Sequence, residues 1–123
     1  MTFFTVINCI DGRIQLPVIQ YLRQQLNVEF IDSITEAGPN LILADKNDIA
    51  IIQSIYNKLD ISFDLHKSQG LAIVGHFGCA GNPSQKSEQI EHIQKAIQLI
   101  QNKYIKKVII GLWVDQNFKV HEV

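Results

Sequence analysis

Strand-like and helix-like segments alternate along most of this 123-residue chain. Short apolar runs rich in β-branched residues are typical of buried strands, and longer segments with apolar residues at helical spacing separate them. The expected strands cover residues 3–9, 28–31, 71–74, 108–113 and 118–123. Because parallel strands need a crossover, usually a helix, this order predicts an α/β fold. We expect a single domain over residues 1–123, with a mostly parallel sheet of about five strands and helices on both faces.

The expected helices cover residues 17–27, 49–59 and 90–104. Pro17 suits a first helical position, where its missing N–H costs little. Residues 35–40 are expected to form a loop, because Gly38 and Pro39 are strong turn signals. Only a short turn at residues 115–117 separates the last two strands, so the fifth strand is expected to be antiparallel.

Composition excludes several classes of function. Apolar residues make up 46% of the chain, which is enough for a buried core, and charged residues make up 19% with a net charge of −1. That balance predicts no nucleic-acid partner and no anionic membrane surface. No apolar run approaches the ~18 residues of a membrane span, and the apolar start lacks the basic residues of a signal peptide. We therefore expect a cytoplasmic protein, in which a structural disulfide between Cys9 and Cys79 is not expected.

Two polar clusters follow the ends of expected strands. They are Cys9-Ile10-Asp11-Gly12-Arg13 and His76-Phe77-Gly78-Cys79. In an open α/β sheet, binding sites form outside the carboxyl ends of strands, where the strand order reverses. If the first and third strands are neighbours, Cys9, His76 and Cys79 converge there. Two thiolates and an imidazole are good zinc ligands and leave a fourth position for water.

This pair of motifs resembles the β-class carbonic anhydrases, with C-x-D-x-R after the first strand and H-x-x-C after a later one. The likeness extends to Glu36-Ala37-Gly38, which stands where that family has an alanine-glycine loop. Residues 108–123 are similar to the family's last apolar strand, aromatic turn and final short strand. The family's N-terminal helices have no counterpart in the sequence, so the chain resembles a short, divergent member.

The resemblance implies a zinc enzyme that reversibly hydrates carbon dioxide to bicarbonate with a metal-bound hydroxide. It implies that Cys9, His76 and Cys79 hold Zn2+. It also implies that Asp11 orients the hydroxide and that Arg13 holds Asp11, although Asp11 binding the zinc directly, in a closed site, stays open. The family likeness places Ala37, Gly38 and Gly78 in the substrate pocket. The partners expected are a small molecule and further copies of the chain, in a homodimer or higher homo-oligomer.

Other interpretations remain. A zinc hydrolase of carbonyl sulfide or carbon disulfide is one, because Thr35 and Glu36 replace residues common in the family's loop. A catalytically inactive zinc-binding or assembly protein is another. If there is no metal site, Cys9 and Cys79 are ordinary buried thiols. In that case Asp11 caps the following helix and forms a surface ion pair with Arg13. The remaining histidines have no motif context and are expected at the surface: His66, His92 and His121.

Overall fold

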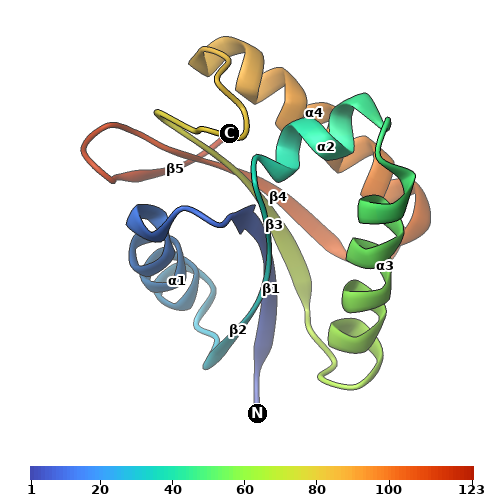
Figure 1. The fold of residues 1–123 in the computed structure, drawn as a ribbon. Helices are drawn as coiled ribbons and strands as arrows, with labels where there is room; N and C mark the ends of the chain where they lie inside the picture. The colour runs from blue at the N-terminus through green and yellow to red at the C-terminus, as the bar shows by residue number, and fades with distance from the viewer.

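The computed structural model describes residues 1–123 as one five-stranded sheet in the order β2-β1-β3-β4-β5 (Figure 1). The strands are β1 (Phe3–Cys9), β2 (Phe30–Glu36), β3 (Gly70–His76), β4 (Val108–Val114) and β5 (Val120–Glu122). The first four are mutually parallel where they pair, and β5 is antiparallel to β4. The predicted fold class, including the antiparallel last strand, is therefore confirmed.

Four helices connect the strands and cover both faces of the sheet. They are α1 (Gly12–Leu26), α2 (Pro39–Asp45), α3 (Ile49–Asp64) and α4 (Lys86–Lys103). α1 lies alone on one face, and the other three helices cover the opposite face (Figure 1). Each face has its own apolar core, with Val6 and Leu22 on the α1 side and Ile73, Leu59 and Ile100 on the other. None of the helices is both long and apolar enough to span a membrane.

α1 begins at Gly12, so the predicted start at Pro17 is wrong. The Asp11 carboxylate accepts the backbone N–H of Arg13 at 2.9 Å and caps the helix. Pro17 lies inside α1 instead, where its missing N–H deprives only the Arg13 carbonyl of an intrahelical donor. The helix ends before Asn27, which adopts the left-handed conformation, and this end agrees with the prediction.

The segment from residue 28 to residue 40 also differs from the prediction. β2 pairs with β1 along its whole length and ends at Glu36, which lies opposite Cys9. Residues 35–40 are therefore not a continuous loop, because Gly38 and Pro39 start α2. β2 is an edge strand with polar and exposed positions, so its sequence lacks the apolar run that identifies a buried strand.

α3 and β3 both extend beyond their predicted ends. Asp48 caps α3 by accepting the N–H of Ile51 at 3.1 Å, and the helix continues to Asp64. β3 is buried along its whole length and continues to His76. Because His76 is the last residue of a central strand, its backbone is fixed by the sheet.

The three tyrosines provide a test of the packing through their titration. Burial is the largest cause of a raised pKa at Tyr21, Tyr56 and Tyr104, and Tyr104 also donates to Asp60 at 2.7 Å. In an ultraviolet absorbance titration we expect less than half of the tyrosine to be ionised at pH 10 while the chain is folded. In urea the midpoint should return to about 10. Because folding raises the pKa of the tyrosines, their neutral form contributes to the free energy of unfolding. This contribution is present below pH ~10 and is lost as the pH rises further. A folded-state midpoint at pH 10 would contradict this packing.

Candidate metal centre

The sheet topology places the candidate site between the carboxyl ends of β1 and β3. These neighbouring strands stop pairing at Ile7 and Ile73, before Cys9 and His76. The chain leaves β1 into α1 on one face and leaves β3 towards α4 on the opposite face (Figure 1). Connections that depart to opposite faces open a crevice at this edge of an α/β sheet. The first and third strands are therefore neighbours, which is the condition for the predicted convergence of Cys9, His76 and Cys79.

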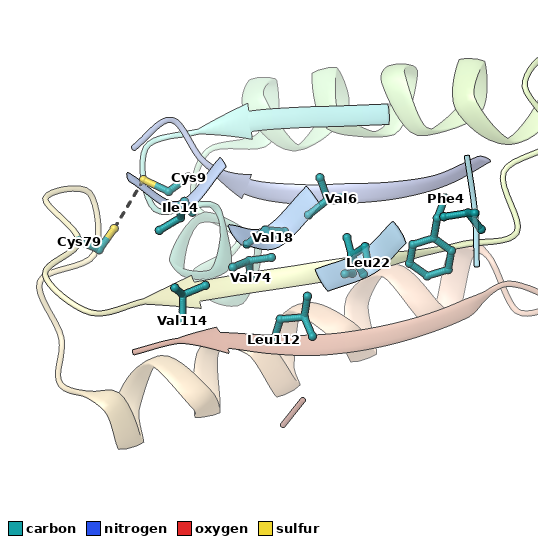
Figure 2. Packing of buried hydrophobic residues seen from close by; sticks show 12 residues of the cluster. Phe4, Val6, Cys9, Ile14, Val18, Leu22, Val74, Cys79, Leu112 and Val114 are labelled. Carbon is teal, nitrogen blue, oxygen red and sulfur yellow. Dashed lines mark hydrogen bonds between the residues drawn. The ribbon is translucent and has the colours of Figure 1, made fainter. Parts of the chain in front are cut away.

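Cys9, His76 and Cys79 meet in this crevice. Their ligand atoms all lie within 4.8 Å of one another, and each residue is at most 4% exposed. The Sγ atoms of the two free cysteines are 3.8 Å apart and point towards each other (Figure 2). A tetrahedral zinc ion with Zn–S bonds of about 2.3 Å would separate two sulfurs by about 3.8 Å. The sulfur spacing therefore fits a shared zinc ion.

The imidazole of His76 presents one nitrogen to the two sulfurs. Its Nδ1 lies 2.9 Å from the carbonyl oxygen of Phe77, which can only accept, so Nδ1 carries the proton. Nε2 then has a free lone pair, and it is buried without any hydrogen-bond partner. A buried polar atom without a partner is unusual, and a metal ion would satisfy it. A carbonyl that fixes the tautomer of a histidine ligand is common around zinc.

The protonation states of these residues respond mainly to burial. Burial lowers the pKa of His76, so the imidazole is favoured in the neutral form that binds metals. Burial also raises the pKa of Cys79, and the neighbouring Cys9 raises it further. Two thiolates this close together are unfavourable without a compensating positive charge. The donor set therefore fits a divalent cation such as zinc, which would supply that charge.

Asp11 and Arg13 form an ion pair beside the cluster. Arg13 Nη2 donates to Asp11 Oδ2 at 2.7 Å, and its Nε donates to Oδ1 at 3.0 Å. Bonds from the Arg13 side chain, and then from its backbone N–H, lower the pKa of Asp11 to about 2. Arg13 Nη2 also donates to the carbonyl of Gly78 at 3.2 Å. Arg13 thus connects the start of α1 to the loop that carries Cys79.

Gln15 also supports the turn after β1, although no sequence motif identifies it. Its Nε2 donates to the carbonyls of Cys9 and Asp11, both at 2.8 Å. Its Oε1 accepts from the amide of Asn8, a fully buried residue, at 3.2 Å. Only its place four residues after Asp11, one helical turn along α1, indicates that it reaches this turn. The turn that follows Cys9 is therefore held to α1.

The residues expected in the substrate pocket lie at two loops that pack together. Gly38 has a φ of +63° and is in backbone contact with Gly81. A Cβ built on Gly81 would lie 2.4 Å from the carbonyl carbon of Ala37. Gly78 immediately precedes Cys79 in the sequence and has a φ of +66°. The loop after β2 therefore braces the loop that carries Cys79.

Substituting the bracing glycine should be costly. We expect Gly81→Ala to lower the free energy of unfolding by about 1–3 kcal/mol, because backbone atoms cannot make room for the added methyl group. Gly12→Ala is the matched control, since a Cβ there meets nothing within 4 Å. It should leave stability unchanged or raise it by up to about 1 kcal/mol. Urea unfolding of the metal-free proteins measures both, and equal effects would contradict the close contact of the loops.

A small hollow of about 70 Å³ lies beside the cluster. Its lining residues are Arg13, Ile14, His76, Phe77, Val114, Asp115, Gln116 and Phe118. A larger surface hollow lies at the far end of α1, where Gln20 and Glu29 contribute to it. It contains none of the residues of the candidate site. None of the residues expected in the substrate pocket, Ala37, Gly38 or Gly78, lines the small hollow beside the cluster.

The remaining histidines lie outside the cluster. His66 and His121 are exposed, as expected. Nδ1 of His66 lies 2.7 Å from the Asp32 carboxylate, and Nε2 of His121 lies 2.8 Å from the Asp115 carboxylate. His92 is only half-buried, and its Nδ1 lies 3.0 Å from the amide nitrogen of Asn82. Of the four histidines, His76 alone has a ligating nitrogen near the two thiols.

A comparison with known protein families identifies the family of this chain. The family described as "Putative carbonic anhydrase" matches it over residues 1–123. The chain belongs to this carbonic anhydrase family. No curated protein sequence matches it.

Solved structures resemble this carbonic anhydrase-family chain in fold. One is a tetrameric β-carbonic anhydrase from the filamentous ascomycete Sordaria macrospora, with a TM-score of 0.64 and 12% sequence identity. The match covers 98% of this chain and 79% of that one. Another is the β-carbonic anhydrase CafA of Aspergillus fumigatus, with a TM-score of 0.56, 11% identity and coverage of 98% and 74%. At these identities the likeness establishes the β-carbonic anhydrase fold.

Proposed function

We propose that the chain binds one zinc ion and catalyses the reversible hydration of carbon dioxide to bicarbonate. The observation that carries the proposal is the buried cluster of two thiols and one imidazole, whose ligand atoms lie within 4.8 Å of one another. Nε2 of that imidazole has no hydrogen-bond partner. The cluster lies beside the Asp11–Arg13 ion pair in a chain of the carbonic anhydrase family. Cys9, His76 and Cys79 would hold the metal, which leaves one tetrahedral position free.

The roles of the protein residues follow from their geometry. Zinc, when bound, lowers the pKa of a bound water from ~15.7 towards neutrality. Asp11 is the group that would accept a hydrogen bond from the attacking oxygen and turn its lone pair towards the carbon of carbon dioxide. Because the pKa of Asp11 is lowered to about 2, its carboxylate is ionised and able to accept throughout the neutral range. Arg13 holds that carboxylate by two parallel bonds, which fixes its orientation.

The conformation of Asp11 supports an open site. Both of its carboxylate oxygens accept hydrogen bonds from Arg13, and one of them also caps α1. A bond from Asp11 to the metal would compete with the bonds that its carboxylate accepts from Arg13. We therefore propose that the fourth metal position is available to water and substrate.

Metal analysis paired with a carbon dioxide hydration assay tests the proposal. We expect one zinc per chain, and hydration that stops when a chelator removes zinc and resumes when zinc returns. A protein that binds no zinc would refute the proposed centre. Zinc-loaded protein without hydration would refute the reaction alone. If such a protein released sulfide from carbonyl sulfide or carbon disulfide, the proposed zinc centre would stand and one of these compounds would be the substrate.

We also propose that the chain forms a homodimer or a higher homo-oligomer. Three apolar side chains flanking the site are exposed: Ile10 is 64%, Phe77 57% and Phe118 48% accessible. Large exposed apolar groups beside a site are typical of contact surfaces. The neighbour from Sordaria macrospora is described as tetrameric. Light scattering at micromolar concentration should show more than one chain per particle, and a monomer would contradict the proposal.

A further inference from the structure

Gln89, in the first turns of α4, is a polar side chain at a core position. It is 1% exposed and lies on the same helix face as Ile93, Ala96 and Ile100, which are all fully buried. An amide buried among apolar side chains is unfavourable unless hydrogen bonds satisfy it. The buried amide of Gln89 therefore needs hydrogen-bond partners inside the protein.

The amide of Gln89 binds both ends of the loop that carries Cys79. Its Nε2 donates to the carbonyl of His76 at 2.8 Å, and its Oε1 accepts the N–H of the same residue at 3.2 Å. The Nε2 also donates to the carbonyls of Asn82 at 3.2 Å and Ser84 at 3.3 Å. One side chain thus bridges the end of β3 and the far end of the loop at residues 76–82.

The surroundings of Gln89 complete a buried network of amides. Asn40, at the start of α2, donates to Gln89 Oε1 at 3.2 Å and accepts from Asn82 at 3.2 Å. All three amide residues are at most 1% exposed. Gly75 makes room for them, because a Cβ there would lie 2.9 Å from both Asn40 Nδ2 and Gln89 Oε1. A buried network with these contacts rigidifies the segments that it joins.

We infer that Gln89 is a positioning residue for the metal centre, which holds His76 and Cys79 at their binding separation before a metal arrives. The inference rests on the proposed zinc site. Cys79 lies inside the bridged loop, and Phe77 is fixed by its N–H bond to the Val114 carbonyl at 3.0 Å. With both loop ends held, zinc binding need not order the loop. Outer partners of this kind typically change metal affinity by 10–100-fold.

Gln101 supplies a matched control on the same helix. It lies near the other end of α4, and its Nε2 also donates to two carbonyls, those of Tyr104 and Lys107, both at 3.1 Å. Gln89→Met and Gln101→Met each remove an amide with little change in side-chain volume. We expect Gln89→Met to weaken zinc affinity by about 10–100-fold in competition with a chromophoric chelator. Gln101→Met should bind zinc like the wild type. We also expect the thiolate–cobalt absorption bands of the cobalt-loaded protein to change only in Gln89→Met.

The outcomes separate this inference from the proposed centre. Wild-type zinc affinity and cobalt bands in folded Gln89→Met would overturn the positioning role, even if its melting temperature falls. A wild-type protein that binds no zinc would overturn the centre itself. If Gln89→Met does not fold, hydrogen exchange of the wild type decides the matter. The His76 amide should be protected equally with and without zinc, and protection that appears only with zinc would refute a loop that is held in advance.

Discussion

Cys79→Ala is expected to weaken zinc binding by about a hundred- to a thousandfold and to reduce carbon dioxide hydration to background. A protein zinc site of four ligands binds with about 10–16 kcal/mol, so one ligand corresponds to roughly 2.5–4 kcal/mol. The loss should be severe here because Cys79 is one of only three protein ligands that the cluster offers. Chelator competition measures the affinity, and the hydration assay at limiting zinc measures the activity.

Ser68→Ala is a suitable control for Cys79→Ala. Ser68 is fully buried just before β3, at the other end of that strand, and its hydroxyl also contacts buried partners. The substitution removes one buried heavy atom, so it should lower stability without affecting zinc binding. If Cys79→Ala behaves like Ser68→Ala, both cysteines are ordinary buried thiols and the centre does not exist.

Asp11→Asn should lower carbon dioxide hydration by about a hundredfold or more while zinc affinity stays within about threefold of the wild type. Groups that handle a proton or orient it in the transition state typically contribute 10²–10⁴-fold. Asparagine caps a helix as well as aspartate does, so α1 should stay intact. The substitution removes the negative charge that Arg13 holds and leaves an amide that accepts hydrogen bonds more weakly. Steady-state hydration kinetics of the zinc-loaded variant measure the effect.

Asp48→Asn is the matched control, because Asp48 caps α3 through the same kind of bond and lies outside the site. It should leave hydration unchanged. An Asp11→Asn variant with the wild-type rate would reduce Asp11 to a helix cap. A large loss of zinc affinity in that variant would instead make Asp11 a metal ligand, which contradicts the open site.

Much of the fold was predictable because its central strands carry the strongest signals. β1 is buried along almost its whole length, so its apolar run gave the correct bounds. The start of α1 differs from the prediction because the Asp11 carboxylate caps the helix and Pro17 lies inside it. β2 begins later and is longer than predicted, because an edge strand can carry polar residues that an apolar pattern does not identify. The length of β2 is set by its pairing with β1, and no local sequence pattern contains that information.

Some residues of the candidate site were predictable from the sequence and others were not. Cys9, His76 and Cys79 belong to short motifs with restricted spacing, so the sequence pointed to them, and the structure brings them together. Gln15 and Gln89 act through backbone carbonyls, which leave no motif. The one available signal for Gln89 was a polar residue four positions before Ile93, within the buried stripe of α4. Such a residue needs buried partners, and the sequence alone does not identify them.

X-ray absorption at the zinc edge of the zinc-loaded protein shows directly whether both cysteines bind the metal. We expect two sulfurs at about 2.3 Å, one imidazole nitrogen at about 2.0–2.1 Å and one further light atom. A zinc shell made only of oxygen and nitrogen would contradict it, because Cys9 and Cys79 would then not be ligands.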